Sequence, residues 1–318
     1  MIIVTGGSGF VGSNLIWGLN QIGIEDILVV DNLSQDDKHR NLNSLKIADF
    51  LDKEDFLAEL PKLEGVQTIF HQGACSSTTE TDGRYMMENN YQFSKTLLHY
   101  SLEKKIDFLY ASSASVYGNG SAGFREERTC EWPLNVYAFS KFSFDNYVRQ
   151  RLSQASSQVL GLRYFNVYGP QENHKGKMAS VAFHLFGQLA QGQKMKLFAG
   201  SEGFRRDFIY VDDIVQMNLH FYQTKTSGIF NAGTGKARSF QDIATTLQQL
   251  EPAGQIEIIP FPDHLEGKYQ EFTEADTTLL RKAGYERPMT SLEDGVRQYY
   301  DLWKRCLLYT SPSPRDQR

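Results

Sequence analysis

Cysteine is scarce in this 318-residue sequence, which contains only Cys75, Cys130 and Cys306. Three cysteines are too few for a disulfide framework, and no Cys/His spacing in the chain is typical of a zinc site. We therefore expect free thiols in a reducing compartment and no metal site.

Long apolar runs and excess positive charge are also missing. No apolar run approaches the roughly 18 residues that span a bilayer, and the first residues lack the basic segment and cleavage site of a signal peptide. The net charge of −5 argues against a general nucleic-acid binder. With 41% hydrophobic and 22% charged residues, the composition is that of a globular protein. We therefore expect a cytoplasmic protein with no membrane or nucleic-acid partner.

A glycine-rich turn lies close to the start of the chain. An apolar run at residues 2–5 precedes Gly6-Gly-Ser-Gly-Phe-Val-Gly12, a helical pattern follows to about residue 23, and a second strand is indicated at residues 26–31. In this strand–turn–helix–strand order, glycines let the backbone approach the pyrophosphate of a dinucleotide at the helix N-terminus. Asp31 ends the second strand, where a ribose hydroxyl would lie. The sequence therefore predicts a dinucleotide site.

Strand and helix patterns continue to alternate after this unit. Strands are indicated at residues 66–70, 106–110 and 158–163, and helices at residues 84–104 and 136–153. This alternation predicts an α/β fold with a Rossmann-type, doubly wound parallel sheet, whose ligands bind at the carboxyl ends of the strands. The glycine turn, Gly73, Ser113 and Asn166 all follow predicted strands, so we expect them at this edge.

The second half of the chain predicts a smaller mixed α/β lobe that binds the substrate. It includes a basic loop, a helix at residues 178–191, a strand at 229–233 that returns to the main sheet, and a strand at 256–259. We expect a division into a dinucleotide-binding domain (residues 1–167 and about 205–236), a substrate-binding lobe (about 168–204 and 237–305) and a disordered tail (306–318). The tail has a Ser-Pro-Ser-Pro run that cannot continue a helix. We interpret it as either a native disordered tail or sequence foreign to the protein, and we favour the second.

Tyr137 and Lys141 are four residues apart in a predicted helix, so their side chains can share one face. A nearby cation favours the phenolate and should lower the phenol pKa from its usual value of about 10. Such a tyrosine can take a proton from an alcohol that Ser113 orients. Alone, the pair is more often a surface feature, but next to a dinucleotide site it indicates alcohol-to-ketone chemistry.

With these motifs the chain resembles the sugar-nucleotide enzymes of the extended short-chain dehydrogenase/reductase superfamily, and within it the ADP-heptose 6-epimerases. The matching segments are residues 71–80, 85–91, 163–170, 174–184, 204–207 and 267–270. The resemblance implies reversible oxidation at C6 of the heptose of ADP-D-glycero-D-manno-heptose by bound NADP, with hydride return to the opposite face. It also implies a role in lipopolysaccharide core synthesis and a homo-oligomer, a pentamer in that family.

The resemblance also implies the site residues. Inversion asks for acid/base groups on both faces of a ketone intermediate, and Lys175 matches the family's second base. The implied catalytic residues are Tyr137, Lys175, Ser113 and Lys141. The implied cofactor residues are Gly6, Gly9, Phe10, Val11, Gly12, Asp31, Asn32, Lys38, Lys53, Gln72, Gly73, Ala74, Cys75, Ser76, Asn89, Lys141, Val167 and Lys175. The implied substrate residues are Ser113, Asn166, Lys177, His184, Phe198, Ala199, Gly200, Ser201, Arg206 and Tyr269.

Some alternatives stay open at this point. Asp31 alone favours NAD, whereas Lys38 and Lys53 can hold the 2′-phosphate of NADP as point charges, and we expect NADP. Lys175 could be a loop lysine that binds phosphate, and Lys177 stands where the family pattern has Ser. A UDP-hexose 4-epimerase is the nearest enzymatic alternative, and an inactive NADP-sensing or interaction protein is an alternative of another class. A 4,6-dehydratase is disfavoured because no Asp-Glu pair follows Ser113.

Overall fold

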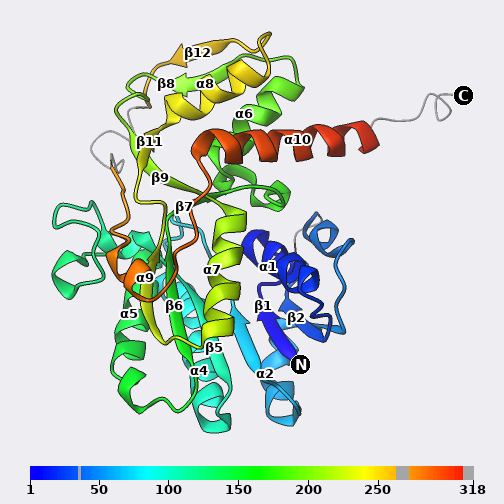
Figure 1. The fold of residues 1–318 in the computed structure, drawn as a ribbon, viewed down its shortest axis with the longest axis vertical. Coiled ribbons are helices and arrows are strands. Elements are labelled where there is room, and N and C mark those ends of the chain that lie inside the picture. Colours follow the sequence, from blue (N-terminus) through cyan, green and yellow to red (C-terminus); the bar gives the residue numbers. More distant parts are fainter. Residues whose placement is uncertain (35–36, 263–271, 311–318) are drawn as a thin grey trace, which may run out of the picture.

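The computed structural model describes residues 1–34, 37–262 and 272–310 (Figure 1). Its larger part is a seven-stranded sheet with the order β10-β6-β5-β4-β1-β2-β3, in which every neighbouring pair is parallel. The strands are β1 (Ile2–Thr5), β2 (Ile27–Asp31), β3 (Asp49–Asp52), β4 (Thr68–His71), β5 (Asp107–Ser113), β6 (Val159–Tyr164) and β10 (Gly228–Ala232). The strand order reverses between β1 and β4, which is where doubly wound sheets bind their ligands. The predicted fold class is confirmed.

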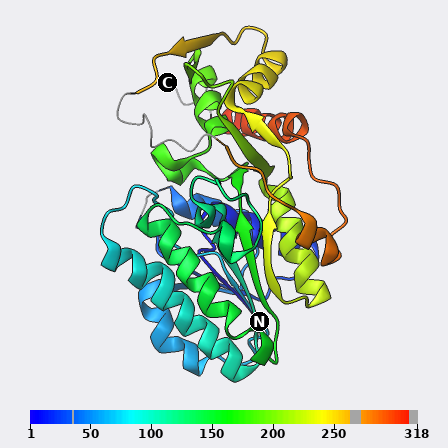
Figure 2. The same ribbon diagram turned by 90° about the vertical axis from the view of Figure 1, so that its left-hand side faces the viewer.

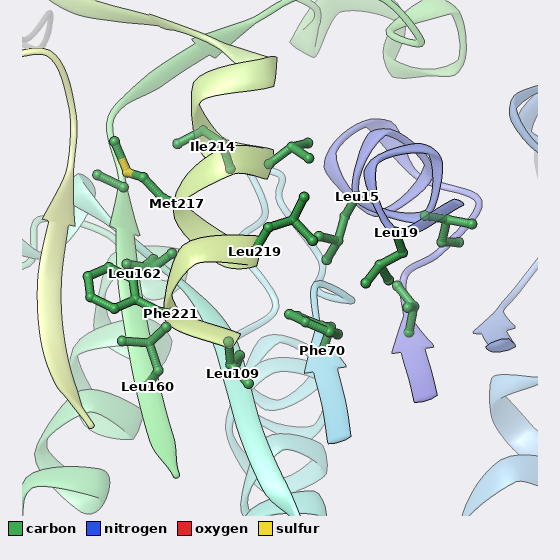
Figure 3. Close-up of a cluster of buried hydrophobic side chains, with 14 of the residues drawn as sticks. Leu15, Leu19, Phe70, Leu109, Leu160, Leu162, Ile214, Met217, Leu219 and Phe221 are labelled. Atoms are coloured by element: carbon green, nitrogen blue, oxygen red, sulfur yellow. The ribbon is translucent and has the colours of Figure 1, made fainter. Parts of the chain in front are cut away.

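Two helices cover one face of this sheet, α1 (Phe10–Gln21) and α7 (Val211–Thr224). Leu15 of α1 and Phe221 of α7 belong to one buried cluster with Phe70 of β4 (Figure 3). Packing of these apolar helix faces on the strands holds the N-terminus of α1 close to the carboxyl end of β1.

Three helices cover the opposite face, α2 (Lys53–Glu59), α4 (Phe93–Lys104) and α5 (Val136–Arg149), as Figure 2 shows. Ile3 of β1 belongs to the buried cluster on this side, whereas Val4 belongs to the cluster on the other side. Successive side chains of a strand point to opposite faces, so a strand between two helix layers is apolar at consecutive positions.

The helix predicted over residues 84–104 is helical throughout but not uniform. It consists of α3 (Gly83–Met87), a π-helical turn, η3 (Glu88–Gln92), and α4. Such π-helical turns occur often at functional sites, and this one lies beside the cavity described below. The other short helical turns are η1 (Lys38–Leu42), η2 (Leu60–Lys62), η4 (Ala114–Tyr117), η5 (Arg128–Cys130), η6 (Leu152–Gln154) and η7 (Asn173–Met178).

The smaller part of the molecule, at the top of Figure 1, contains two small sheets. In one, β12 (Ile256–Ile259) runs parallel to β8 (Met195–Phe198); in the other, β9 (Arg205–Tyr210) lies between β11 (Ala237–Ser239) and β7 (Asn166–Tyr168). The strand predicted at residues 256–259 is therefore confirmed, and the β7–β9–β11 sheet joins segments that we expected in different domains.

Helices α6 (Val181–Ala190), α8 (Phe240–Leu250) and α10 (Leu292–Thr310) surround the core of this smaller part, which includes Phe186 and Leu247. No helix within the described residues is both long enough and apolar enough to cross a membrane. These helices and the small sheets form the mixed α/β lobe that the sequence predicts.

Two features of the C-terminal third differ from what the sequence suggests. Leu280 and Tyr285, around α9 (Thr278–Lys282), belong to the buried cluster of the main sheet, although we assigned residues 237–305 to the smaller lobe. The predicted division into two domains therefore stays a proposal. Helix α10 also continues to Thr310, past the expected end near Trp303, because the first helix-breaking proline is Pro312. The rest of the predicted tail, residues 311–318, lies outside the described residues.

Candidate active site

A cavity of about 540 Å³ opens at the carboxyl ends of β1, β2, β4 and β5. Every predicted cofactor residue except Val167 lines it, and so do the predicted catalytic residues Ser113, Tyr137, Lys141 and Lys175. The fold thus brings side chains from distant segments of the chain to the sheet edge at which the sequence predicts a dinucleotide.

The glycine turn forms the floor of this cavity. Gly6 has a φ of +67°, in the left-handed region that favours glycine. A Cβ atom added at Gly12 would lie 2.1 Å from the carbonyl oxygen of Gly6, so no other residue fits here without a shift of the backbone. This close packing leaves the first turn of α1 facing the cavity, and the positive end of a helix favours phosphate. The turn therefore fits a dinucleotide.

Asp31 is buried at the end of β2, and both of its carboxylate oxygens are engaged. Its Oδ2 accepts hydrogen bonds from the backbone N–H (2.9 Å) and the hydroxyl (2.5 Å) of Ser8 in the glycine turn. Its Oδ1 accepts from the backbone N–H of Asn32 (2.7 Å) and from Nζ of Lys38 (2.5 Å). Asp31 therefore anchors the turn and holds a lysine ammonium at this end of the cavity.

The π-helical turn η3 contributes two asparagines to the site. Asn89 accepts a hydrogen bond from Nζ of Lys53 at 2.9 Å, and both residues line the cavity. Asn90 is buried and bonds both backbone groups of Cys75, accepting from its N–H (2.8 Å) and donating to its carbonyl oxygen (2.9 Å). Asn90 also donates to the Ser140 hydroxyl of α5 at 3.1 Å. Sequence reasoning missed Asn90, which ties a wall of the cavity to the helix that carries Tyr137.

Tyr137 and Lys141 lie one turn apart on α5, as predicted, but the electrostatics differ from the prediction. Burial raises the pKa of the Tyr137 hydroxyl, and a side-chain hydrogen bond with Ser113 acts in the opposite direction. The Lys141 ammonium donates to the carbonyl oxygen of Ala111 at 2.7 Å, and burial lowers its pKa to about 8. The expectation that Lys141 lowers the pKa of Tyr137 is therefore wrong for this structure, because burial dominates at both residues.

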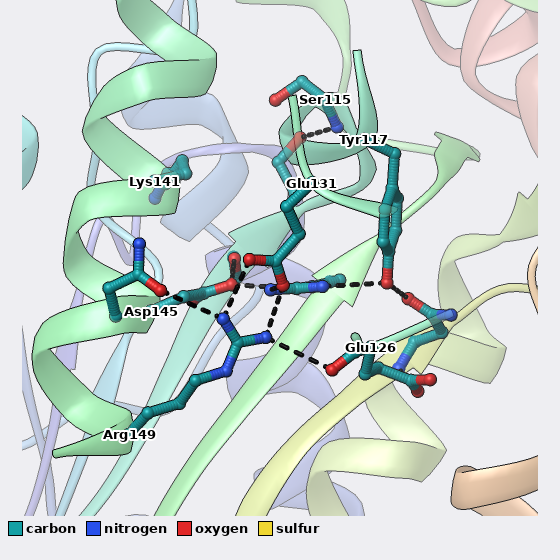
Figure 4. Close-up of polar contacts among 12 residues, drawn as sticks. Ser115, Tyr117, Glu126, Glu131, Lys141, Asp145 and Arg149 are labelled. Atoms are coloured by element: carbon teal, nitrogen blue, oxygen red, sulfur yellow. Dashed lines mark hydrogen bonds and ion pairs between the residues drawn. The ribbon is translucent and has the colours of Figure 1, made fainter. Parts of the chain in front are cut away.

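A buried polar network holds α5 against β6 behind these residues (Figure 4). Arg163 of β6 donates from Nε to Asp145 of α5 at 2.8 Å and from Nη1 to the Tyr117 hydroxyl at 2.9 Å. Glu131 accepts hydrogen bonds from both Arg163 and Arg149. Because Asp145 and Arg149 belong to the helix that carries Tyr137, the network fixes the position of that residue relative to the sheet.

Lys175 lies in the loop between β7 and α6. Its Nζ is 3.3 Å from Oε2 of the buried Glu172 and 4.7 Å from the centroid of the Phe10 ring, at the start of α1. It lines the first cavity and also a second cavity of about 420 Å³. Asn166 and Arg206, two predicted substrate residues, line the second cavity. Lys175 is therefore at the boundary between the predicted cofactor and substrate sites.

Several predicted residues have other positions. Val167, which we assigned to the cofactor, lines the second cavity instead, because it lies on β7 in the smaller lobe. Lys177 and His184 are exposed, and neither they nor residues 198–201 line either of these two cavities. Tyr269 lies outside the described residues. We assigned these residues from matching sequence segments, which do not show where a residue lies in the fold.

Asn41 connects the glycine turn to the Lys175 loop, and sequence reasoning missed it. Its side-chain amide donates to the carbonyl oxygen of Ser8 at 3.0 Å and lies 3.3 Å from Nδ1 of His174. Burial, together with Lys38 and Lys175, lowers the pKa of His174 to about 4. No local pattern marks this asparagine, since its partners are distant in the sequence.

Among the residues that the structure describes, no group of His, Cys, Asp or Glu side chains could hold a metal ion.

Comparison with known proteins places this arrangement among sugar-nucleotide enzymes. The model of the NAD dependent epimerase/dehydratase family matches residues 2–233. The ADP-L-glycero-D-manno-heptose-6-epimerase of Brachyspira hyodysenteriae is 56% identical over 312 residues, which are 96% of this chain and 98% of that protein. The likeness therefore extends over both the main sheet and the smaller lobe.

Solved structures give the same result. The ADP-L-glycero-D-manno-heptose-6-epimerase of Helicobacter pylori superposes with a TM-score of 0.84 at 33% identity, covering 95% of each chain. The UDP-glucose 4-epimerase of Thermotoga maritima has a TM-score of 0.82 at 27% identity, covering 96% of this chain and 99% of that one. Both the sheet and the lobe thus have counterparts in enzymes named as epimerases.

Proposed function

The chain belongs to the NAD dependent epimerase/dehydratase family, and from this we propose that it inverts C6 of the heptose in ADP-D-glycero-D-manno-heptose. The product is ADP-L-glycero-D-manno-heptose, a precursor of the lipopolysaccharide core. The relative from Brachyspira hyodysenteriae supports this substrate, because it is named for it and is 56% identical over almost the whole chain.

The observation that carries the proposal is the position of two acid/base candidates around one cavity. Tyr137, with Ser113, lines it from the α5 side, whereas Lys175 lines it from the loop before α6 and also faces the second cavity. Inversion at an alcohol carbon asks for proton transfer on both faces of a ketone intermediate. We assign the proton at the C6 oxygen to Tyr137 on one face and to Lys175 on the other.

A nicotinamide cofactor, when bound, supplies the hydride acceptor and donor for the oxidation and the return step. The glycine turn and the N-terminus of α1 would hold its pyrophosphate. We propose NADP over NAD because Lys38 and Lys53 line the cavity near the end of β2, and because both Asp31 oxygens already have protein partners. Two ammonium groups can bind a 2′-phosphate as point charges. A fluorescence titration that gave tighter binding of NAD than of NADP would contradict this choice.

Conversion of the substrate without added cofactor tests the proposed function. The purified protein is incubated with ADP-D-glycero-D-manno-heptose, and the C6 configuration is followed by NMR. We expect the L-glycero epimer to form with no net reduction of pyridine nucleotide, because the cofactor is regenerated in each turnover. No conversion, even with NADP added, would contradict the assignment, and UDP-hexoses would be tested next.

The role of Lys175 has a separate test. Lys175→Met removes the ammonium but keeps an unbranched side chain. If Lys175 is the second base, kcat falls while the KM for the ADP-heptose changes little, because the lost interaction belongs to the transition state. A rise in KM with unchanged kcat would instead make Lys175 a phosphate ligand.

A UDP-hexose 4-epimerase is the second candidate, favoured by the structural likeness to the Thermotoga maritima enzyme. Dehydration is disfavoured by the cavity itself. Among the described residues, Asp31 is the only carboxylate that lines the cavity of about 540 Å³, and Ser113 is followed by Ala114 and Ser115. Water elimination beside Ser113 would need an acid/base pair that this wall lacks.

The setting of the enzyme is part of the proposal. We place it in the cytoplasm, where nucleotide sugars are made, and as a homo-oligomer, the pentamer that the family resemblance implies. Native mass spectrometry at micromolar concentration would measure the oligomeric state directly.

A further inference from the structure

Glu172 is a fully buried carboxylate that the proposed mechanism does not use, and its side chain is 0% exposed. Its Oε1 accepts hydrogen bonds from the Gly169 backbone N–H (3.2 Å) and the Ser180 hydroxyl (2.7 Å). Its Oε2 accepts from the Ser180 backbone N–H (2.6 Å) and from Nζ of Lys175 (3.3 Å). Four donors therefore converge on one carboxylate, which compensates for the cost of burying its charge.

These bonds connect Glu172 to both ends of the loop between β7 and α6. Gly169 lies just after β7, and Ser180 is the residue that caps α6. Lys175 lies between them in the sequence, and its only described anion partner is Glu172. The three shorter bonds fix the carboxylate in the loop, so Oε2 is a fixed point against which the lysine ammonium is held.

The ammonium also lies 4.7 Å from the centroid of the Phe10 ring, within cation–π range. Phe10 begins α1, directly after the glycine turn, and lines both cavities as Lys175 does. The ammonium thus contacts both a buried carboxylate and a ring at the glycine turn, and Lys175 lines both cavities. A long, flexible side chain in a loop would otherwise have many rotamers.

We propose that Glu172 is a positioning residue for the reaction: it holds Lys175 at the boundary between the cofactor and substrate cavities. This inference rests on the proposed role of Lys175 as second base. Glu172 does not touch the reacting atoms, and it acts through the lysine. Since misplacement of a reacting group by about 1 Å can cost about 100-fold in rate, loss of the carboxylate should reduce turnover more than it reduces substrate binding.

Glu172→Gln tests this, with Glu251→Gln as the matched control, because Glu251 also pairs with a lysine, Lys304, at 2.8 Å but lines neither cavity. Glutamine keeps the shape, but its amide nitrogen cannot accept hydrogen bonds and carries no charge. We expect kcat to fall by roughly 10- to 100-fold, with the KM for ADP-D-glycero-D-manno-heptose within about twofold and the content of bound cofactor unchanged. Glu251→Gln removes the same kind of carboxylate–lysine pair but leaves the Glu172–Lys175 contact, so its kcat should stay close to that of the wild type.

A double-mutant cycle separates positioning from a purely structural role. In a Lys175→Met background, Glu172→Gln should cause little further loss of residual epimerisation, because its effect passes through the lysine. Equal losses in both backgrounds, an unchanged kcat in Glu172→Gln, or an equal fall in Glu251→Gln would each overturn the inference but not the proposed role of Lys175. Full kcat in Lys175→Met would instead overturn the proposed base and the inference with it. If Glu172→Gln does not fold, Glu172→Asp, which withdraws the charge by one methylene, takes its place in the same cycle.

Discussion

Replacement of Glu131 by glutamine tests the buried network that supports α5. The Glu131 side chain is 0% exposed and contacts the guanidinium groups of Arg128, Arg149 and Arg163. Burial alone would raise the pKa of Glu131, but the hydrogen bonds and charges of Arg149 and Arg163 lower it from 4.5 to about 2. A shift of this size corresponds to about 3 kcal/mol of stability at neutral pH.

The pH dependence has a definite sign. Because the pKa of Glu131 is lower in the folded state, its contribution is fully present above pH 4.5, the unfolded value, and is lost as the pH falls towards 2. We expect Glu131→Gln to lower the free energy of unfolding by about 3 kcal/mol at pH 7, since one partner of a buried ion pair is removed. The difference in free energy of unfolding between wild type and Glu131→Gln should decrease below pH 4.5, because there the Glu131 carboxyl of the unfolded wild-type chain becomes protonated.

Urea denaturation followed by circular dichroism at several pH values between 7 and 3 would measure this gap. Glu127→Gln is the matched control, because Glu127 is 55% exposed and pairs with the exposed Arg125 at 3.3 Å. Exposed pairs contribute only about 0–1 kcal/mol, so this variant should behave almost as the wild type. A gap that is the same at every pH, or equal effects of the two substitutions, would refute the reasoning.

Three further predictions concern the site. Tyr137→Phe should reduce kcat by about 100- to 10,000-fold without lowering Tm; NMR of the C6 epimers measures the rate, and full turnover would contradict the mechanism. Lys38→Met should weaken NADP binding by roughly tenfold, the equivalent of about 1.4 kcal/mol, and leave NAD binding unchanged; fluorescence titration checks both, and equal losses would contradict a 2′-phosphate contact. Gly12→Ala places a Cβ atom 2.1 Å from the Gly6 carbonyl oxygen, so the purified variant should lose its cofactor; nucleotide extraction measures it, and full retention would contradict the close packing.

The parts of the fold that sequence reasoning predicted are those with strong local patterns. The glycine turn and the apolar strand β1, for example, can be recognised from the order of strand, turn and helix within a few residues of the chain. The edge strand β3 was missed because only two of its four residues, Asp49-Phe-Leu-Asp52, are apolar, and none of the four is fully buried. The packing of Leu280 against the main sheet was also missed, since it depends on contacts with distant segments.

The same distinction applies to the site. Tyr137 and Lys141 could be found because one helical turn separates them. Asn41, Asn90 and Glu172 could not, because the partners that give them a role are brought close only by the fold. The sign of the pKa shift at Tyr137 was wrong for a related reason: burial depends on the packed structure, and here it raises the pKa more than the hydrogen bond with Ser113 lowers it.

The fate of the hydrogen at C6 tests the central claim most directly. ADP-D-glycero-D-manno-heptose carrying deuterium at C6 is converted by the holoenzyme in ordinary water, and the product is analysed by NMR and mass spectrometry. Transient oxidation with hydride return predicts that the L-glycero epimer keeps the deuterium at C6 and that no net reduced cofactor accumulates. Loss of the deuterium to solvent would mean that C6 is deprotonated instead, and would contradict the account of Tyr137 and Lys175 as proton donors and acceptors at the C6 oxygen.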